Sequence, residues 1–174
     1  MKVIFLDIDG VLNSLDNMSA MTLMWKTNEL IHKSRDVFGH LFDERCVLWL
    51  KYIISRTDAK IVISSTWRCK GLQEMQMMFK ARGLSVEVIG CTPTIVDEYI
   101  INLYASSNNE ADRGYEIAQW IYEHEQALES YCIIDDDSDM LSMQKPYFVK
   151  TDSDIGLNYK AAHQAIAILN STNQ

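Results

Sequence analysis

The sequence has little proline and glycine, and no part of it resembles a flexible linker. Only two prolines and seven glycines occur among its 174 residues. No segment rich in these residues divides the chain, and its length suits one domain with a substantial core. We therefore expect residues 1–174 to form a single domain.

Cysteine patterns typical of zinc or redox sites are missing. The four cysteines form no C-x-x-C pair and have no metal-ligand spacing. Cys91 and Cys132 adjoin apolar runs, which predicts that they are small buried side chains. A reducing compartment is the simplest expectation for such a chain.

Long apolar segments are missing as well. The chain has no run of about 18 apolar residues, so the sequence predicts no membrane-spanning helix. Asp7 and Asp9 interrupt the N-terminal apolar stretch where a signal peptide would need it. These absences favour a cytoplasmic location, but a protein that is injected into a cell would share them.

Positive charge is scarce. The chain has 16 Lys and Arg against 24 Asp and Glu, which gives a formal net charge of −8. A surface field of this sign repels nucleic acid and anionic membranes. Broad, non-specific nucleic-acid binding is therefore disfavoured, whereas a small basic patch around one phosphate is not.

The chain does contain an alternation of short apolar runs with helical patterns. Apolar residues recur at helical spacing in 43–56, 72–82, 113–127 and 158–169, with Asp43 and Asn158 as expected N-caps and Gly83 as a terminator. The apolar runs are 3–6, 61–63, 86–89, 132–134 and 147–149. Unbroken runs between helices predict an α/β fold with a Rossmann-like, doubly wound parallel sheet and helices on both faces.

Two segments fit this alternation poorly, at about 14–42 and 94–112. Neither is long enough for a separate domain, and the first shows no clear strand. We expect both to be small insertions above the sheet, so that the domain has a small cap or none.

Acidic residues follow two of the predicted strands. Asp7 and Asp9 end the first apolar run, and Gly10 allows a sharp turn there. Asp135 and Asp136 end the run at 132–134 and begin a wider acidic cluster. The carboxyl ends of parallel strands share one edge of the sheet, where ligands bind in doubly wound folds. So many carboxylates in one crevice favour a hard cation such as Mg²⁺.

A calcium-binding EF-hand is excluded by spacing. Such a loop needs an oxygen ligand at its fifth position and Glu at its twelfth. Counted from Asp7, these positions hold Val11 and Met18. The two acids therefore belong to another kind of site.

Hydroxyl groups and cations supply candidate phosphate ligands. Ser64 and Ser65 end the run at 61–63, and Arg68 and Lys70 follow them. Arg113 stands at the start of the helix that precedes the acidic strand. Hydroxyls and N–H groups near a helix start are natural donors to phosphate oxygens. Each of these cations is also compatible with an ordinary surface position.

The ordered set resembles the haloacid dehalogenase-like (HAD) hydrolase superfamily. Its four motifs match the segment 7–13, Ser64, Arg113 and the pair Asp135-Asp136. The segments 63–68 and 151–157 further resemble the HAD phosphatase domains of nucleic-acid repair proteins. The third motif of the superfamily is often Lys, so Arg68 and Lys70 are rivals of Arg113.

The resemblance implies a magnesium-dependent phosphatase. Asp7 would be the covalent nucleophile, and Asp9 would be the general acid and base. Asp7, the backbone carbonyl of Asp9, and Asp135 would hold Mg²⁺, with Asp136 nearby. The phosphoryl group would be bound by the motif residues Ser64 and Arg113, with Ser65, Arg68 and Lys70 as further candidates.

Substrate and class are left open by the sequence. A small cap favours a large substrate, such as a phosphorylated nucleic-acid end, and a nucleotide or small phosphoester is the alternative partner. A receiver-like phospho-acceptor module and a non-catalytic metal-binding interaction domain are the competing classes. Sustained phosphate turnover would separate the enzyme from both.

Overall fold

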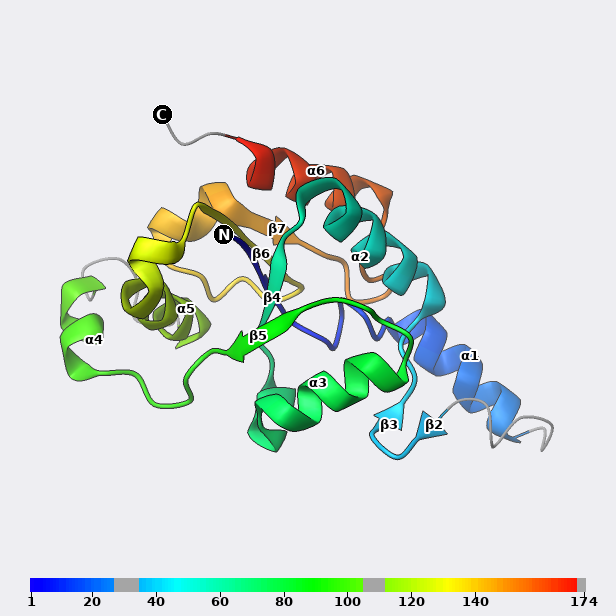
Figure 1. The fold of residues 1–174 in the computed structure, drawn as a ribbon. Coiled ribbons are helices and arrows are strands. Elements are labelled where there is room, and N and C mark those ends of the chain that lie inside the picture. Colours follow the sequence, from blue (N-terminus) through cyan, green and yellow to red (C-terminus); the bar gives the residue numbers. More distant parts are fainter. Residues whose placement is uncertain (27–34, 105–111, 172–174) are drawn as a thin grey trace.

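A five-stranded parallel sheet forms the centre of the protein. The computed structural model describes residues 1–26, 35–104 and 112–171, and the strand order is β5-β4-β1-β6-β7 (Figure 1). The strands are β1 (Lys2–Leu6), β4 (Lys60–Ile63), β5 (Val88–Cys91), β6 (Ser130–Asp135) and β7 (Phe148–Lys150). All four pairings between adjacent strands are parallel, which confirms the predicted sheet.

Both faces of the sheet are buried, which explains the unbroken apolar runs. Ile4 and Leu6 of β1 belong to one core with residues of α2 (Glu44–Thr57), α3 (Leu72–Ala81) and α6 (Tyr159–Asn170). Val3 and Phe5 belong to a second core with α5 (Asp112–His124). Alternate side chains of a strand point to opposite faces, so each strand is apolar at nearly every position.

The helix boundaries follow from local capping chemistry. The side chain of Asp43 accepts from the Arg45 N–H at the start of α2, and Asn158 accepts from the Ala161 N–H at the start of α6. At the end of α3, Gly83 has φ +70°, and the N–H of Leu84 donates to the Phe79 carbonyl at 2.9 Å. This is the bonding of a Schellman motif, and the predicted terminator is confirmed.

One helix is shorter than its pattern predicts. α5 ends at His124, and the 3-10 helix η2 (Glu125–Ala127) follows it. The apolar stripe at Ile117, Trp120 and Ile121 lies within α5, so the stripe identified the packed face but not the end of the helix.

The two predicted insertions contain small elements outside the sheet. The first carries α1 (Leu15–Lys26) and the hairpin strands β2 (Arg35–Asp36) and β3 (Gly39–His40), which the sequence did not reveal. The second carries α4 (Glu98–Tyr104), which packs against α5. Residues 27–34 and 105–111 of these insertions lie outside the described residues.

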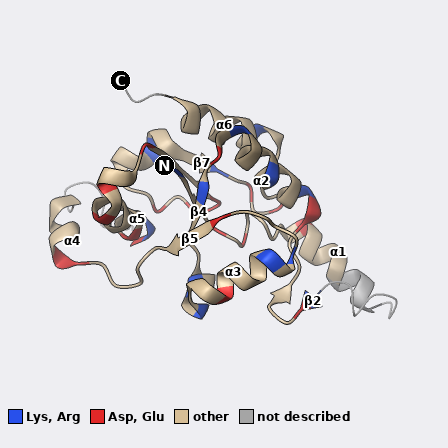
Figure 2. Ribbon diagram, viewed as in Figure 1, with Lys and Arg blue, Asp and Glu red and all other residues tan. Residues whose placement is uncertain are grey.

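The described surface is mixed in charge. Figure 2 shows basic and acidic segments interspersed over the helices. Among residues 1–26, 35–104 and 112–171, every helix is too short or too polar to cross a bilayer. The cysteines carry free thiols; Cys132 is buried as predicted, whereas Cys91 is only half-buried.

Candidate active site

The carboxyl ends of β1 and β6 bring three acidic side chains together. Leu6 pairs with Ile134 across these adjacent strands, and the Asp7 N–H donates to the Ile134 carbonyl at 3.0 Å. The carboxylates of Asp7, Asp135 and Asp136 offer oxygens that all lie within 4.8 Å of one another. The predicted meeting of the two strand ends is therefore confirmed.

Burial and mutual repulsion disfavour the charged form of these acids. Asp7 and Asp135 are 6% and 1% exposed. Burial is the main cause that raises the pKa of each carboxyl, and the nearby Asp7 charge raises the pKa of Asp135 further. Arg113 opposes both shifts. On its own the group would hold protons, and a divalent cation would let its members ionise together.

The donor set fits a hard metal ion. Oδ1 of Asp135 accepts from the Asp137 N–H at 2.9 Å, while buried Oδ2 has no hydrogen-bond partner among the described residues. Buried polar atoms are rarely left unpaired in proteins. Three carboxylates with one such orphaned oxygen suit Mg²⁺, which prefers oxygen ligands and retains waters.

Gly10 is required by this close packing. Its φ is +71°, and an added Cβ would lie 2.2 Å from Cγ of Asp136. Only glycine both adopts the left-handed conformation readily and leaves space for that carboxylate. Gly10 therefore leaves the space that the carboxylate of Asp136 occupies.

Asp9 lies apart from the three-acid group and has its own partners. Its Oδ2 accepts from the indole Nε1–H of Trp67 at 2.7 Å, and its Oδ1 accepts from the Asn13 amide at 3.0 Å. Asp9 is exposed. Two donors thus fix this exposed carboxylate, and sequence reasoning did not identify either contact.

The two serines after β4 have different surroundings. A hydrogen bond from Ser65 lowers the pKa of Asp7. Ser64 is fully buried, its hydroxyl has no partner among the described residues, and its carbonyl accepts from the Arg113 guanidinium. The structure therefore brings the Ser65 hydroxyl to Asp7, and the Ser64 hydroxyl is unsatisfied without a further ligand.

Arg113 reaches the acids from the start of α5. Its Nε lies 3.7 Å from Oδ2 of Asp135, and its backbone N–H donates to Oδ2 of Asp139 at 3.2 Å. The Asp139 carboxylate thereby accepts from an N–H group in the first turn of α5, where such groups have no partner within the helix. A signal for this contact was present in the sequence, because Asp139 lies in the acidic cluster after β6.

The rival cations are engaged elsewhere. Arg68 forms an ion pair with Glu116 of α5, and its guanidinium also donates to the Ser65 carbonyl. Lys70 donates to the Phe38 carbonyl at 3.2 Å and lies over the Trp67 ring. Both belong to η1 (Thr66–Lys70), and of the three candidates it is Arg113 that forms an ion pair with the acid group.

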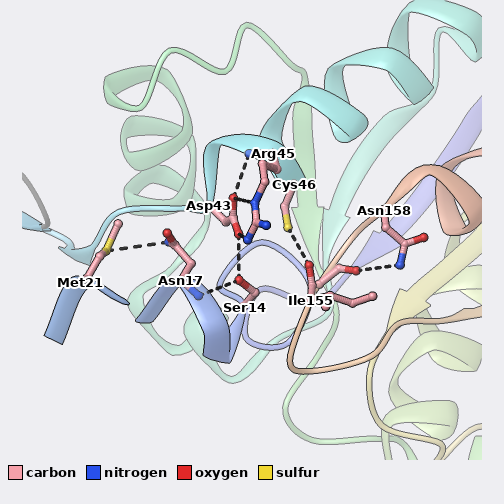
Figure 3. Close-up of polar contacts among 9 residues, drawn as sticks. Ser14, Asn17, Met21, Asp43, Arg45, Cys46, Ile155 and Asn158 are labelled. Carbon is pink, nitrogen blue, oxygen red and sulfur yellow. Dashed lines mark hydrogen bonds and ion pairs between the residues drawn. The ribbon is translucent and has the colours of Figure 1, made fainter. Parts of the chain in front are cut away.

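The loop that follows β7 holds the turn after β1. Thr151 Oγ1 donates to the Gly10 carbonyl at 3.0 Å, and the Leu157 N–H donates to the Val11 carbonyl at 2.9 Å. The Cys46 thiol points to the Ile155 carbonyl from α2, as Figure 3 shows. The bonds from Thr151 and Leu157 fix the turn that contains Gly10, a role that the sequence did not reveal.

The fold and the acidic site together define a HAD-like α/β protein. A family model described as the HAD domain in Swiss Army Knife RNA repair proteins matches residues 3–162. The chain belongs to this family, which indicates a phosphatase-type hydrolase. Neither a curated protein nor a solved structure matched the chain.

Proposed function

We propose that the protein is a magnesium-dependent phosphomonoesterase that uses Asp7 as its nucleophile. The observation that supports this most is the convergence of Asp7, Asp135 and Asp136 at one sheet edge. A carboxylate beside two further acids can attack a phosphate only when a cation is present, because the phosphate is itself negative and would be repelled.

The reaction runs in two displacements. A carboxylate oxygen of Asp7 attacks phosphorus, the ester P–O bond breaks, and Asp9 gives a proton to the departing oxygen. Asp9 then removes a proton from water, which attacks the phosphorus of the aspartyl-phosphate and releases inorganic phosphate. Asp7 is regenerated, and two easier steps replace one difficult displacement.

Asp7 and Asp135 would hold Mg²⁺ through carboxylate oxygens, with the Asp9 carbonyl and Asp136 as further candidates. When bound, the ion supplies positive charge that offsets the repulsion between nucleophile and phosphate. The fit rests on the three carboxylates and on the orphaned Oδ2 of Asp135.

Arg113, Ser64 and Ser65 would bind the phosphoryl oxygens. Arg113 is mostly buried beside Asp135, and Ser65 hydrogen-bonds to Asp7. Fixed donors next to the nucleophile stabilise charge that spreads over the oxygens in the transition state. Arg68 and Lys70 are weaker candidates, because Arg68 forms an ion pair with Glu116 and Lys70 donates to the Phe38 carbonyl.

A phosphorylated nucleic-acid end or a nucleotide is the proposed substrate. The family description refers to RNA repair, and the described insertion elements are short: α1, the β2–β3 hairpin and α4. A receiver-like module would use similar acids but would be phosphorylated once and stop. Repeated turnover distinguishes the two, and any turnover excludes a non-catalytic binding domain.

The test is hydrolysis of an aryl phosphate with and without Mg²⁺ by the wild type and by Asp7→Asn. We expect phosphate release in many turnovers that requires Mg²⁺ and is lost in the variant. Circular dichroism of the variant should match that of the wild type. Full activity of the folded variant would refute the nucleophile assignment.

A further inference from the structure

A cavity lies beside the three-acid group, at the edge of the sheet formed by β7. It has a volume of about 720 Å³ and is bounded by β7, the start of α6 and the loop between them. This size is within the range of cavities that hold small ligands. Asp136 lines the cavity and also belongs to the acid group, so the two spaces adjoin.

The lining of this cavity is polar and carries two cations. Lys150 and Lys160 line it together with the amides of Asn158 and Gln164. Lys150 already donates one hydrogen bond from Nζ to the Ser138 hydroxyl at 2.7 Å. Lys160 is exposed in the first turn of α6 and forms no ion pair within the described residues. Lys160 is therefore free to meet an anionic ligand.

Two acids also line the cavity, and they limit what it can bind. Asp136 would face the metal ion under the proposed function, so its charge would be offset there. Asp152 is the second acid of the lining, and its Oδ1 accepts from the Asp154 N–H at 2.9 Å. The cavity is thus suited to a ligand with polar groups and a single phosphate rather than to a polyanion.

We propose that this cavity binds a second phosphate, carried by the leaving group of the substrate next to the phosphate that is removed. The proposal rests on the proposed function and extends it to substrate choice. Because the acid group and the cavity share Asp136, a substrate whose terminal phosphate lies at Asp7 would extend into the cavity, where Lys160 would pair with the next phosphate along. This is the chemistry of a nucleic-acid terminus or a nucleoside bisphosphate.

The test compares three substrates: a terminally phosphorylated trinucleotide, a nucleoside 3′,5′-bisphosphate and an aryl phosphate. Lys160→Ala should lower the ratio of kcat/KM on the trinucleotide to that on the aryl phosphate by about fivefold, the effect of one charged contact. The dependence of log kcat/KM on log salt should become shallower by about one unit. Asp152→Asn, which keeps the Oδ1 acceptor, should raise the ratio.

Lys80→Ala is the matched control. Lys80 is an exposed lysine of α3, which packs on β5 at the opposite edge of the sheet. This variant removes the same charge from the molecule but not from the cavity. It should leave the ratio and the salt dependence as in the wild type.

The outcomes are separable. If Lys160→Ala lowers kcat/KM relative to the aryl phosphate for the trinucleotide alone, the cavity recognises a nucleic-acid strand. If it lowers this ratio for the trinucleotide and for the nucleoside bisphosphate, the cavity recognises the adjacent phosphate itself. An unchanged ratio after Lys160→Ala, or an equal change in Lys80→Ala, overturns the cavity proposal. Trinucleotide affinity, measured by fluorescence anisotropy, needs no turnover; weaker binding by Lys160→Ala without hydrolysis by the wild type would refute only the proposed function.

Discussion

Asp9 is the residue whose surroundings say most about how the proposed reaction is controlled. Its two carboxylate oxygens accept from Trp67 and Asn13, so the side chain is held although it is exposed. A fixed carboxylate can transfer a proton efficiently only when its geometry matches the departing oxygen. Under the proposed function, Trp67 would therefore be a positioning residue that acts through Asp9.

Trp67→Phe tests this role. The ring is retained while the N–H donor to Asp9 is removed, so we expect kcat to fall by about tenfold on an alkyl phosphate, the loss of one hydrogen bond to a charged group. The loss on an aryl phosphate should be smaller, because a good leaving group needs less protonation. Equal losses on both substrates would contradict a role through Asp9.

Single residues also mark the limit of sequence reasoning. Asp7 and Asp135 could be predicted because each follows an apolar run, and parallel strand ends share an edge. The choice between Ser64 and Ser65 could not be predicted, since it depends on which hydroxyl faces Asp7. The Trp67 contact with Asp9 joins residues 58 positions apart and has no local signal.

At the level of elements, the β2–β3 hairpin is attached to the end of α3 by one ion pair. Nε and a terminal nitrogen of Arg82 donate to the two Asp36 oxygens at 2.9 and 3.0 Å. The Arg82 side chain is 3% exposed and lies over the Phe42 ring at 4.2 Å. A buried guanidinium needs its partner, so this pair should fix the hairpin next to η1.

Asp36→Asn should lower the free energy of unfolding at pH 7 by about 1–2 kcal/mol, the cost of a charged hydrogen-bonded contact. Hydrogen bonding by Arg82 lowers the pKa of Asp36, so its contribution is present above the unfolded value of about 3.9. It is lost as the pH falls through the lower folded value. Urea unfolding at several pH values should therefore show the difference shrinking in acid; a constant difference would contradict this account.

The elements themselves were largely predictable, and their ends and additions were not. Helices α2, α3, α5 and α6 and the five strands of the main sheet follow from periodicity and from caps such as Asp43 and Asn158, whereas the 12-residue α1 was not predicted. The hairpin strands are two residues each, too short for any alternation to show. The change from α5 to η2 at His124 could not be predicted, because the composition of the chain does not change there.

For the whole molecule, metal binding and folding should be coupled. The three acids repel one another without a cation, so under the proposed function the folded state would bind Mg²⁺ and the unfolded state would not. We expect Mg²⁺ at about 100 times its Kd to stabilise the protein by about 2.7 kcal/mol. If residues 1–174 form one domain, calorimetry should show a single transition that moves upward with Mg²⁺.

Asp135→Asn is the control for this coupling, and its effect changes sign with the metal. Burial and the nearby Asp7 charge raise the pKa of Asp135, so at pH 7 folding disfavours the ionised carboxyl that the unfolded chain carries. Asn at this position removes that cost, so the metal-free variant should be more stable than the metal-free wild type. It also removes a proposed ligand, so added Mg²⁺ should shift its melting temperature much less. A shift equal to that of the wild type would place the ion elsewhere.

The most direct test of the account is to trap the acyl phosphate on Asp7. The protein is mixed with substrate and Mg²⁺, quenched with borohydride and analysed by peptide mass spectrometry. We predict that residue 7 is converted to homoserine, because borohydride reduces an aspartyl-phosphate, and that samples without Mg²⁺ show no conversion. Hydrolysis that proceeds with no modification at residue 7, or with modification at another aspartate, would contradict the central claim.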